Sequence, residues 1–199
     1  MATPSSAPLT FTTTLAAGDA GMRAQLAEAD KYRAFIEAAA QQFGFQPSVI
    51  CGIGSRESGW GLLLKPPGPA GTGDFAQRKP KPPLRPDRMP PDGKGFGRGL
   101  MQIDFDFHPL AQSGNWHDPE TNIRYGCQVL AQKLGYVRKN SGLQNLMLLR
   151  GAVAAYNCGE GNVCKALAEG SDVDARTTGR DYSADVLNRA GFFQLHGWT

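Results

Sequence analysis

One acidic side chain stands among small and apolar residues in the stretch CGIGSRESGWGLL, residues 51–63. This residue is Glu57, and four glycines around it remove side chains, so that a polymer or another part of the backbone can come close. A carboxyl that is buried at the C-terminal end of a helix has a raised pKa and keeps its proton near neutral pH. It can then donate that proton to a leaving group. Taken alone, a glutamate is more often a solvated or ion-paired helix residue.

A second carboxyl in a different environment would complete a pair that cleaves glycosidic bonds, with one acid as proton donor and the other as base for water. The candidates are Asp104, which follows GLMQI, and Asp92, which opens a glycine-rich loop. Asp106 alternates with Asp104 and points the other way in a regular strand. The alternative for either candidate is an aspartate at a turn or at a strand end.

Two helices are expected to position Glu57. Apolar residues recur at steps of three and four from Asp19 to Gly44, which predicts one amphipathic helix. Pro47 suits the first turn of a second, shorter helix that runs to about Ser58. This arrangement places Glu57 at the C-terminal end of the second helix.

The rest of the chain predicts a mostly α (α+β), single-domain protein. Nine of the fourteen prolines fall between residues 65 and 91 with several basic residues, which predicts a long insertion without helix or central strand. The segment LMQIDFDF predicts a small hairpin or sheet. Further helices are expected near residues 118–139, 143–156, 163–168 and 182–194. Residues 1–17 read as a flexible tail, and residues 18–199 as the domain.

Composition limits the classes of partner. A formal net charge of +3 is too weak to argue for nucleic acid, although it helps contact with anionic polymers. No stretch has the length of a membrane helix, so no membrane insertion is expected, and the first 21 residues lack the order of a secretory signal. Four cysteines, Cys51, Cys127, Cys158 and Cys164, allow three full pairings. Their spacing fits no zinc pattern and favours buried thiols or structural bridges, so neither a metal nor a cofactor is expected.

Four motifs in order resemble those of goose-type lysozymes, which are relatives of the lytic transglycosylases. They are SRESGWG, GKGFGRGLMQID followed by His108, GAVAAYNCGEGNV and DYSADVLNRAGFFQLHGW. The resemblance covers about residue 20 to the C-terminus, except the Pro-rich insertion. It implies a lysozyme-like fold, with a small sheet beside the cleft. It also implies hydrolysis of the β-1,4 bond between N-acetylmuramic acid and N-acetylglucosamine in peptidoglycan, by a secreted and monomeric enzyme.

The resemblance also implies roles for individual residues. Glu57 matches the catalytic acid of the family, Asp104 matches the aspartate that positions the attacking water, and Asp92 is similar to a second assisting aspartate. The match of Asp92 depends on a gap, because GFGRG has an extra residue. The substrate-binding positions implied by the motifs are Gln102, His108, Tyr156, Asn157 and Tyr182.

Two alternatives to a hydrolase follow from the same sequence. HDPETNIRYGCQVL is similar to lytic transglycosylases, which use only the glutamate and leave a 1,6-anhydro end. The hydrolase is favoured because Asp104 is present. A wall-binding module without catalysis is the other alternative, and the retained Glu57 with Tyr156 and Asn157 counts against it.

Overall fold

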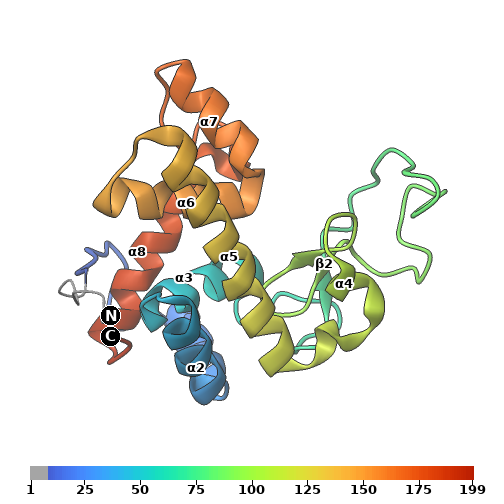
Figure 1. Cartoon of the computed structure of the whole chain (residues 1–199). Helices are drawn as coiled ribbons and strands as arrows, with labels where there is room; N and C mark the ends of the chain where they lie inside the picture. Colours follow the sequence, from blue (N-terminus) through green and yellow to red (C-terminus); the bar gives the residue numbers. More distant parts are fainter. Residues whose placement is uncertain (1–8) are drawn as a thin grey trace.

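The computed structural model describes residues 9–199, with a helical body on one side and a small sheet with a long loop on the other (Figure 1). The mostly α fold class predicted from the sequence is confirmed. The α-helices are α1 (Ala20–Asp30), α2 (Arg33–Phe43), α3 (Pro47–Ser58), α4 (Pro109–Ser113), α5 (Pro119–Ser141), α6 (Asn145–Cys158), α7 (Glu160–Ala168) and α8 (Tyr182–Leu195). Two 3₁₀ turns, η1 (Asn115–His117) and η2 (Thr178–Arg180), complete the helical elements of this part of the chain.

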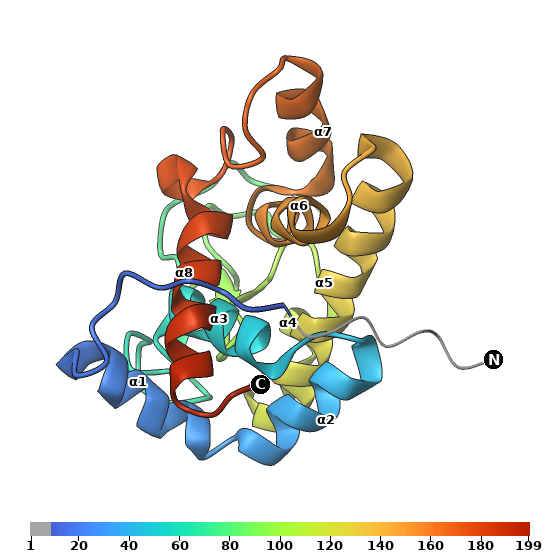
Figure 2. The same ribbon diagram turned by 90° about the vertical axis from the view of Figure 1, so that its left-hand side faces the viewer.

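Helix α3 lies in the middle of the helical body, with α2 and α8 packed against it (Figure 2). It begins at Pro47, as predicted, and Gly59 caps its end with a left-handed φ of 56° that glycine adopts at little cost. Val49, Ile50 and Ile53 are buried in the core. Gly52 faces α8 so closely that a Cβ there would clash with backbone atoms of α8. The absence of a side chain at this position therefore sets the distance between α3 and α8.

The first predicted helix is broken into α1 and α2. Asp19 caps α1, because its carboxylate accepts a hydrogen bond from the Met22 amide at 2.8 Å. The break falls at Lys31 and Tyr32, where the Tyr32 amide bonds back three residues to Ala29. Tyr32 stacks on the buried Trp60, with ring centroids 6.2 Å apart. The apolar spacing continues through the break, so periodicity alone predicts one helix.

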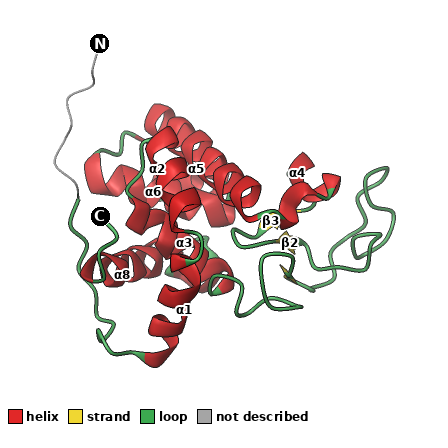
Figure 3. Ribbon diagram, turned by 90° about the horizontal axis from the view of Figure 1, so that it is seen from below, coloured by secondary structure: helices red, strands yellow, loops and turns green. Residues whose placement is uncertain are grey.

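The sheet has three short antiparallel strands, β1 (Thr72–Gly73), β2 (Gly97–Arg98) and β3 (Ile103–Asp104), in the order β1-β2-β3. Gly97 is opposite both Gly73 and Asp104 in the register. Viewed from below, the strands lie beyond α3, between the helical body and the long loop (Figure 3). The predicted small β region around Ile103 is therefore present, and it joins two further strands from glycine-rich segments.

The Pro-rich segment forms the long connection between β1 and β2, which projects away from the helices (Figure 1). Strand β1 lies within the 65–91 segment predicted as an insertion. The loop is anchored by Arg85, whose side chain is 1% exposed and binds the Asp106 carboxylate with bonds of 3.0 and 2.9 Å. These contacts give the proline-rich loop a defined path over the sheet.

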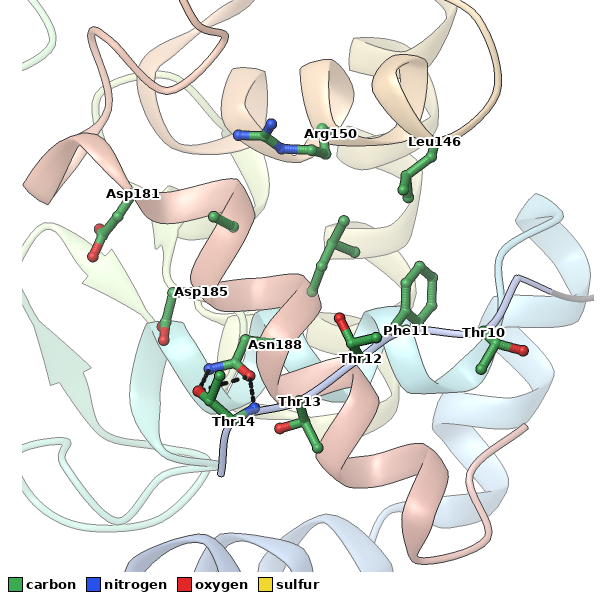
Figure 4. Close-up of a pocket in the computed structure, with 12 residues that line it drawn as sticks. Thr10, Phe11, Thr12, Thr13, Thr14, Leu146, Arg150, Asp181, Asp185 and Asn188 are labelled. Carbon is green, nitrogen blue, oxygen red and sulfur yellow. Dashed lines mark hydrogen bonds between the residues drawn. The ribbon is translucent and has the colours of Figure 1, made fainter. Parts of the chain in front are cut away.

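The N-terminal segment differs from the flexible tail predicted for residues 1–17. Residues 1–8 lie outside the described residues, but the segment that follows runs along α8 (Figure 4). Phe11 is 8% exposed and its amide donates to Gln194, while the Thr14 amide donates to Asn188 at 2.7 Å. Gly191 makes room for this backbone, because a Cβ there would lie 2.8 Å from two of its carbonyl oxygens. Such contacts depend on residues far apart in the sequence.

The four cysteines are all free thiols: Cys51 and Cys127 are buried, and Cys158 and Cys164 are half-buried. The sequence alone did not decide between free thiols and disulfide bridges. In the part of the chain that the structure describes, no helix has the length and apolar character needed to cross a membrane.

Candidate active site

Glu57 lies in the last turn of α3, at the boundary between the helical body and the sheet. The residue is half-buried, and partial loss of contact with water raises the pKa of its carboxyl from the usual 4.5 to about 7. A hydrogen bond from the Tyr182 hydroxyl and the nearby charge of Arg56 both lower this pKa, but they offset the burial only in part. A substantial fraction of Glu57 is therefore protonated at neutral pH.

Residues at the start of α8 organise the surroundings of this acid and of its neighbour Arg56. Tyr182 is 2% exposed and donates its hydroxyl hydrogen to the Glu57 carboxylate. Arg56 is turned toward acidic partners, with bonds of 2.8 Å to Asp185 and 3.0 Å to Asp181. Because its guanidinium already has two carboxylates, Arg56 does not form an ion pair with Glu57.

Polar groups from α6 and the sheet lie beside Glu57. The Tyr156 hydroxyl donates to the Met101 carbonyl at 2.8 Å, and the Asn157 side chain accepts a bond from the Thr178 amide at 2.9 Å. Gln102 has a left-handed φ of 48°, and its side-chain amide donates a hydrogen bond to the Gly99 carbonyl at 2.8 Å. Gly73 and Gly97 leave space for the Gln102 side chain, since a Cβ at either position would clash with it.

Two carboxylates extend from the sheet and share one cation. Asp104 ends β3, and Asp74 directly follows β1. Arg78, from the long loop, forms a two-point contact with Asp104 at 2.6 and 3.1 Å, and the nitrogen of the shorter bond is also 2.6 Å from an Asp74 oxygen. Burial by itself would lower the pKa of Arg78, but its hydrogen bonds to Asp104 and Asp74 raise the pKa above its usual value. Arg78 is therefore charged.

These groups line one cleft of about 580 Å³. Six of the eight residues predicted from the sequence meet there: Glu57, Gln102, Asp104, Tyr156, Asn157 and Tyr182. The other lining residues, which sequence reasoning missed, are Arg56, Asp74, Arg78, Gly97 and Thr178. An available signal for Asp74 was its place in GTGD, a small-residue turn before the basic segment. The spacing of four between Asp74 and Arg78 is a weaker signal, because acid and base pairs at this spacing are common.

Asp92 and His108 lie outside the lining of this cleft. Asp92 instead pairs with both terminal nitrogens of the fully buried Arg98, each at 2.9 Å. Burial would raise the pKa of Asp92, but the hydrogen bonds from Arg98 and the Lys94 amide lower it overall. A buried guanidinium requires a counter-charge, and this explains the position of Asp92. The structure thus does not bring Asp92 to Glu57, and an assisting role for Asp92 stays a prediction that this position does not favour.

His108 lies next to Tyr125, whose hydroxyl is 3.4 Å from His108 Nδ1. Burial lowers the pKa of His108, with a smaller contribution from the charge of Lys133. A sugar contact through His108 stays a prediction.

A larger hollow of about 760 Å³ lies between the N-terminal segment, α6 and α8 (Figure 4). Its acidic residues are Asp181 and Asp185, and both are ion-paired with Arg56. None of the residues predicted to act in catalysis or substrate binding lines it. The smaller cleft therefore has the better arrangement for chemistry.

The cleft combines a carboxyl from a helix, whose pKa is raised to about 7, with two carboxyl groups from the sheet that both bind Arg78. A carboxyl with a pKa near 7 can donate a proton to a leaving oxygen at neutral pH. A carboxylate on the other element can accept a proton from water. This pair of roles is the requirement for hydrolysis of a glycosidic bond.

Comparisons with known proteins agree with this chemistry. Residues 88–197 match the family model described as Lysozyme g. The chain is 33% identical to lysozyme g of Gallus gallus over 174 residues, which are 87% of this chain and 68% of that protein. It is 32% identical over 168 residues to lysozyme g of Epinephelus coioides, with 83% of this chain and 75% of that protein covered. Identity to lysozyme g of Takifugu rubripes is 35% over 170 residues, again with 83% and 75% covered.

Proposed function

The chain belongs to the lysozyme g family and is a glycosidase, and we propose that it hydrolyses the β-1,4 bond between N-acetylmuramic acid and N-acetylglucosamine in peptidoglycan. The observation that carries this proposal is the cleft in which Glu57, with a pKa of about 7, faces the carboxylates of Asp74 and Asp104. Peptidoglycan as the substrate class follows from the family. Hydrolysis as the reaction type is supported by the carboxylates.

In the proposed reaction, Glu57 gives its proton to the oxygen that leaves with the second sugar. The bond between this oxygen and the anomeric carbon breaks, and a water oxygen forms a new bond to that carbon. The water loses one proton to a carboxylate of the sheet. Before the next turnover, that carboxylate releases its proton to solvent and Glu57 regains one from solvent. The Tyr182 hydroxyl, which bonds to the Glu57 carboxylate, stabilises the ionised form that the first step leaves.

Asp104 and Asp74 are both candidates for the base. Asp104 accepts bonds from Arg78 and from the Asp106 amide, so most of its accepting capacity is used. The side chain of Asp74 is 42% exposed, compared with 27% for Asp104, and it has more room for a water molecule. We therefore propose that Asp104 and Asp74 together hold the water, with either one able to receive its proton.

Sugar rings would bind along the polar groups of the cleft. Gln102, Asn157 and Tyr156 line it and present amide or hydroxyl groups, which suit the hydroxyl and N-acetyl groups of the substrate. Tyr182 is proposed to position the acid. His108 would contact sugar only if the polymer extends beyond the described cleft.

The products of wall digestion test the reaction type. Hydrolysis adds one water, whereas a lytic transglycosylase leaves a 1,6-anhydro end, and mass analysis of the released muropeptides separates the two. We expect hydrated products from the wild type and none from Glu57→Gln. Anhydro products would assign the transglycosylase reaction, and wall binding without cleavage would indicate a binding module. If the products are hydrated, NMR of the first product is expected to show the α-anomer, because water enters opposite the acid in an inverting enzyme.

Two further properties are proposed from the family resemblance. The enzyme acts outside the cell on bacterial walls and lyses them, and it works as a monomer. Light scattering of the purified protein checks the second proposal, since a stable dimer would give twice the expected mass.

A further inference from the structure

Arg78 joins the long loop to the carboxylates of the cleft. One terminal nitrogen of its guanidinium is 2.6 Å from an oxygen of Asp74 and 2.6 Å from an oxygen of Asp104. The other terminal nitrogen is 3.1 Å from the second oxygen of Asp104. Two negative groups thus share one positive group within the lining of the cleft.

The surrounding structure holds Arg78 in this orientation. Its guanidinium carbon lies 3.9 Å from the centre of the Phe96 ring, which is buried. Its own amide bonds to the Arg88 carbonyl at 3.0 Å, which ties together the two ends of the loop. Arg85 lies 4.8 Å from the same ring and binds Asp106, so it anchors the loop independently. A side chain restrained on several sides loses little further entropy when it binds two carboxylates.

On the loop and sheet side, the carboxylate nearest to this group already has a cation of its own. Asp106 pairs with Arg85, and it is 3.5 Å from Arg78. Lys81 donates its ammonium hydrogen to the Asp106 carbonyl at 2.7 Å. Asp106 therefore has its own counter-charge, and Arg78 is the cation in hydrogen-bonding contact with Asp74 and Asp104 among the described residues.

On the helical side, no group within residues 9–199 replaces the charge of Arg78. Arg56 is ion-paired with aspartates at the start of α8. Glu57 and Tyr182 are bonded to each other, and neither is a cation. His108 is near Asp104, but burial lowers its pKa and favours its neutral form.

We propose that Arg78 is a positioning residue that keeps Asp74 and Asp104 ionised together and directed into the cleft, so that one can accept the proton of the attacking water. This inference rests on the proposed function. Two carboxylates that contact the same nitrogen repel each other strongly once the cation is removed, and one of them then takes up a proton. A protonated carboxyl cannot act as the base. The Pro-rich loop would thus contribute to catalysis through Arg78.

The variants Arg78→Gln, Arg78→Lys and Arg88→Gln test the role of the charge. Arg88 is the matched control, because it is exposed on the same loop and its side chain makes no ion pair within residues 9–199. The measurement is the pH dependence of kcat/KM on a soluble peptidoglycan fragment, whose acidic limb reports the base of the free enzyme. Thermal unfolding of each variant at each pH establishes that the protein measured is folded.

We expect Arg78→Gln to move the acidic limb to higher pH by about one unit, since like charges at this separation interact strongly near a protein surface. Arg88→Gln leaves the carboxylates untouched and should stay within about 0.3 unit of the wild type. Arg78→Lys keeps the charge but loses the two-point contact with Asp104, so its shift should lie between those of Arg88→Gln and Arg78→Gln. If Arg78→Gln lowers kcat/KM by the same factor at every pH and leaves the acidic limb in place, the proposal is overturned. Arg78 would then only hold the loop against the sheet. An equal shift in Arg88→Gln would also overturn it.

A second measurement does not need activity. In the protein labelled with carbon-13 at aspartate carboxyls, NMR titration should show one carboxyl of the cleft pair titrating at higher pH in Arg78→Gln than in the wild type. Identical titrations would refute the role of Arg78, whatever the enzyme does to walls. Cleavage by the wild type but not by Glu57→Gln, with unchanged titrations, would retain the proposed function and reject only this inference. If the wild type is inactive but the carboxyl titration of Arg78→Gln is shifted, the proposed function is rejected and the effect of Arg78 on the carboxyls is retained.

Discussion

The raised pKa of Glu57 makes the stability of the folded protein depend on pH, and Glu57→Gln measures that dependence. Burial moves this pKa from 4.5 to about 7, and at 1.36 kcal/mol per unit the difference corresponds to about 3 kcal/mol. The unfolded chain releases the proton near pH 4.5, whereas the folded protein keeps it to about pH 7. The stability that the protonated Glu57 contributes is therefore complete below pH 4.5, and it is lost as the pH rises through 7.

Glutamine is neutral at every pH, so Glu57→Gln does not lose this stability as the pH rises. The free energy of unfolding of the variant, relative to the wild type, should increase by about 3 kcal/mol between roughly pH 4 and pH 9. Urea unfolding at several pH values, followed by circular dichroism, gives this difference directly. The variant should also lose nearly all wall lysis, because the cleft no longer has a proton donor.

Glu120→Gln is the control for this experiment, since Glu120 is exposed in the first turn of α5. Its stability relative to the wild type should change little over the same pH range, because the side chain is in water whether the chain is folded or not. A difference between Glu57→Gln and the wild type that stays constant within about 0.5 kcal/mol would refute a buried, protonated Glu57.

Three further outcomes are expected. Tyr182→Phe removes a hydrogen bond that lowers the pKa of Glu57, so the alkaline limb of kcat against pH should move to higher pH, and a move to lower pH would contradict the assigned contact. Gly52→Ala forces a Cβ into the backbone of α8 and should lower the free energy of unfolding in urea by about 1–3 kcal/mol. Gly135→Ala is the control, because its Cβ meets open space within α5, and it should leave this free energy unchanged or raise it by up to about 1 kcal/mol. Lys79→Gln removes an exposed charge from the long loop and should weaken binding to whole walls at low salt, measured by co-sedimentation. Equal binding at every salt concentration would argue against an electrostatic role for the loop.

Local signals in the sequence determined several elements of the fold. Asp118 and Pro119 mark the start of α5, and the Asp118 carboxylate accepts the Thr121 amide hydrogen at 2.8 Å. Pro47 and Gly59 likewise bound α3 and place Glu57 in its last turn. Caps and first-turn prolines act over a few residues, so they can be recognised without knowledge of the rest of the chain. The break between α1 and α2 involves contact of Tyr32 with Trp60, which no local pattern contains.

The membership of the cleft depended in part on tertiary structure. Motifs in the sequence identified Glu57 and Asp104, and both line the cleft. Asp92, the nearest acid before the glycine-rich segment, forms an ion pair with the buried Arg98. Asp74 lines the cleft instead, although it lies at the other end of the loop. Arg78 was predicted only as one of several basic loop residues. Which carboxylate meets which cation depends on the pairing of β1 with β2 and on the anchoring of the loop by Arg85, and these contacts join residues whose separation in sequence carries no information about their distance in space.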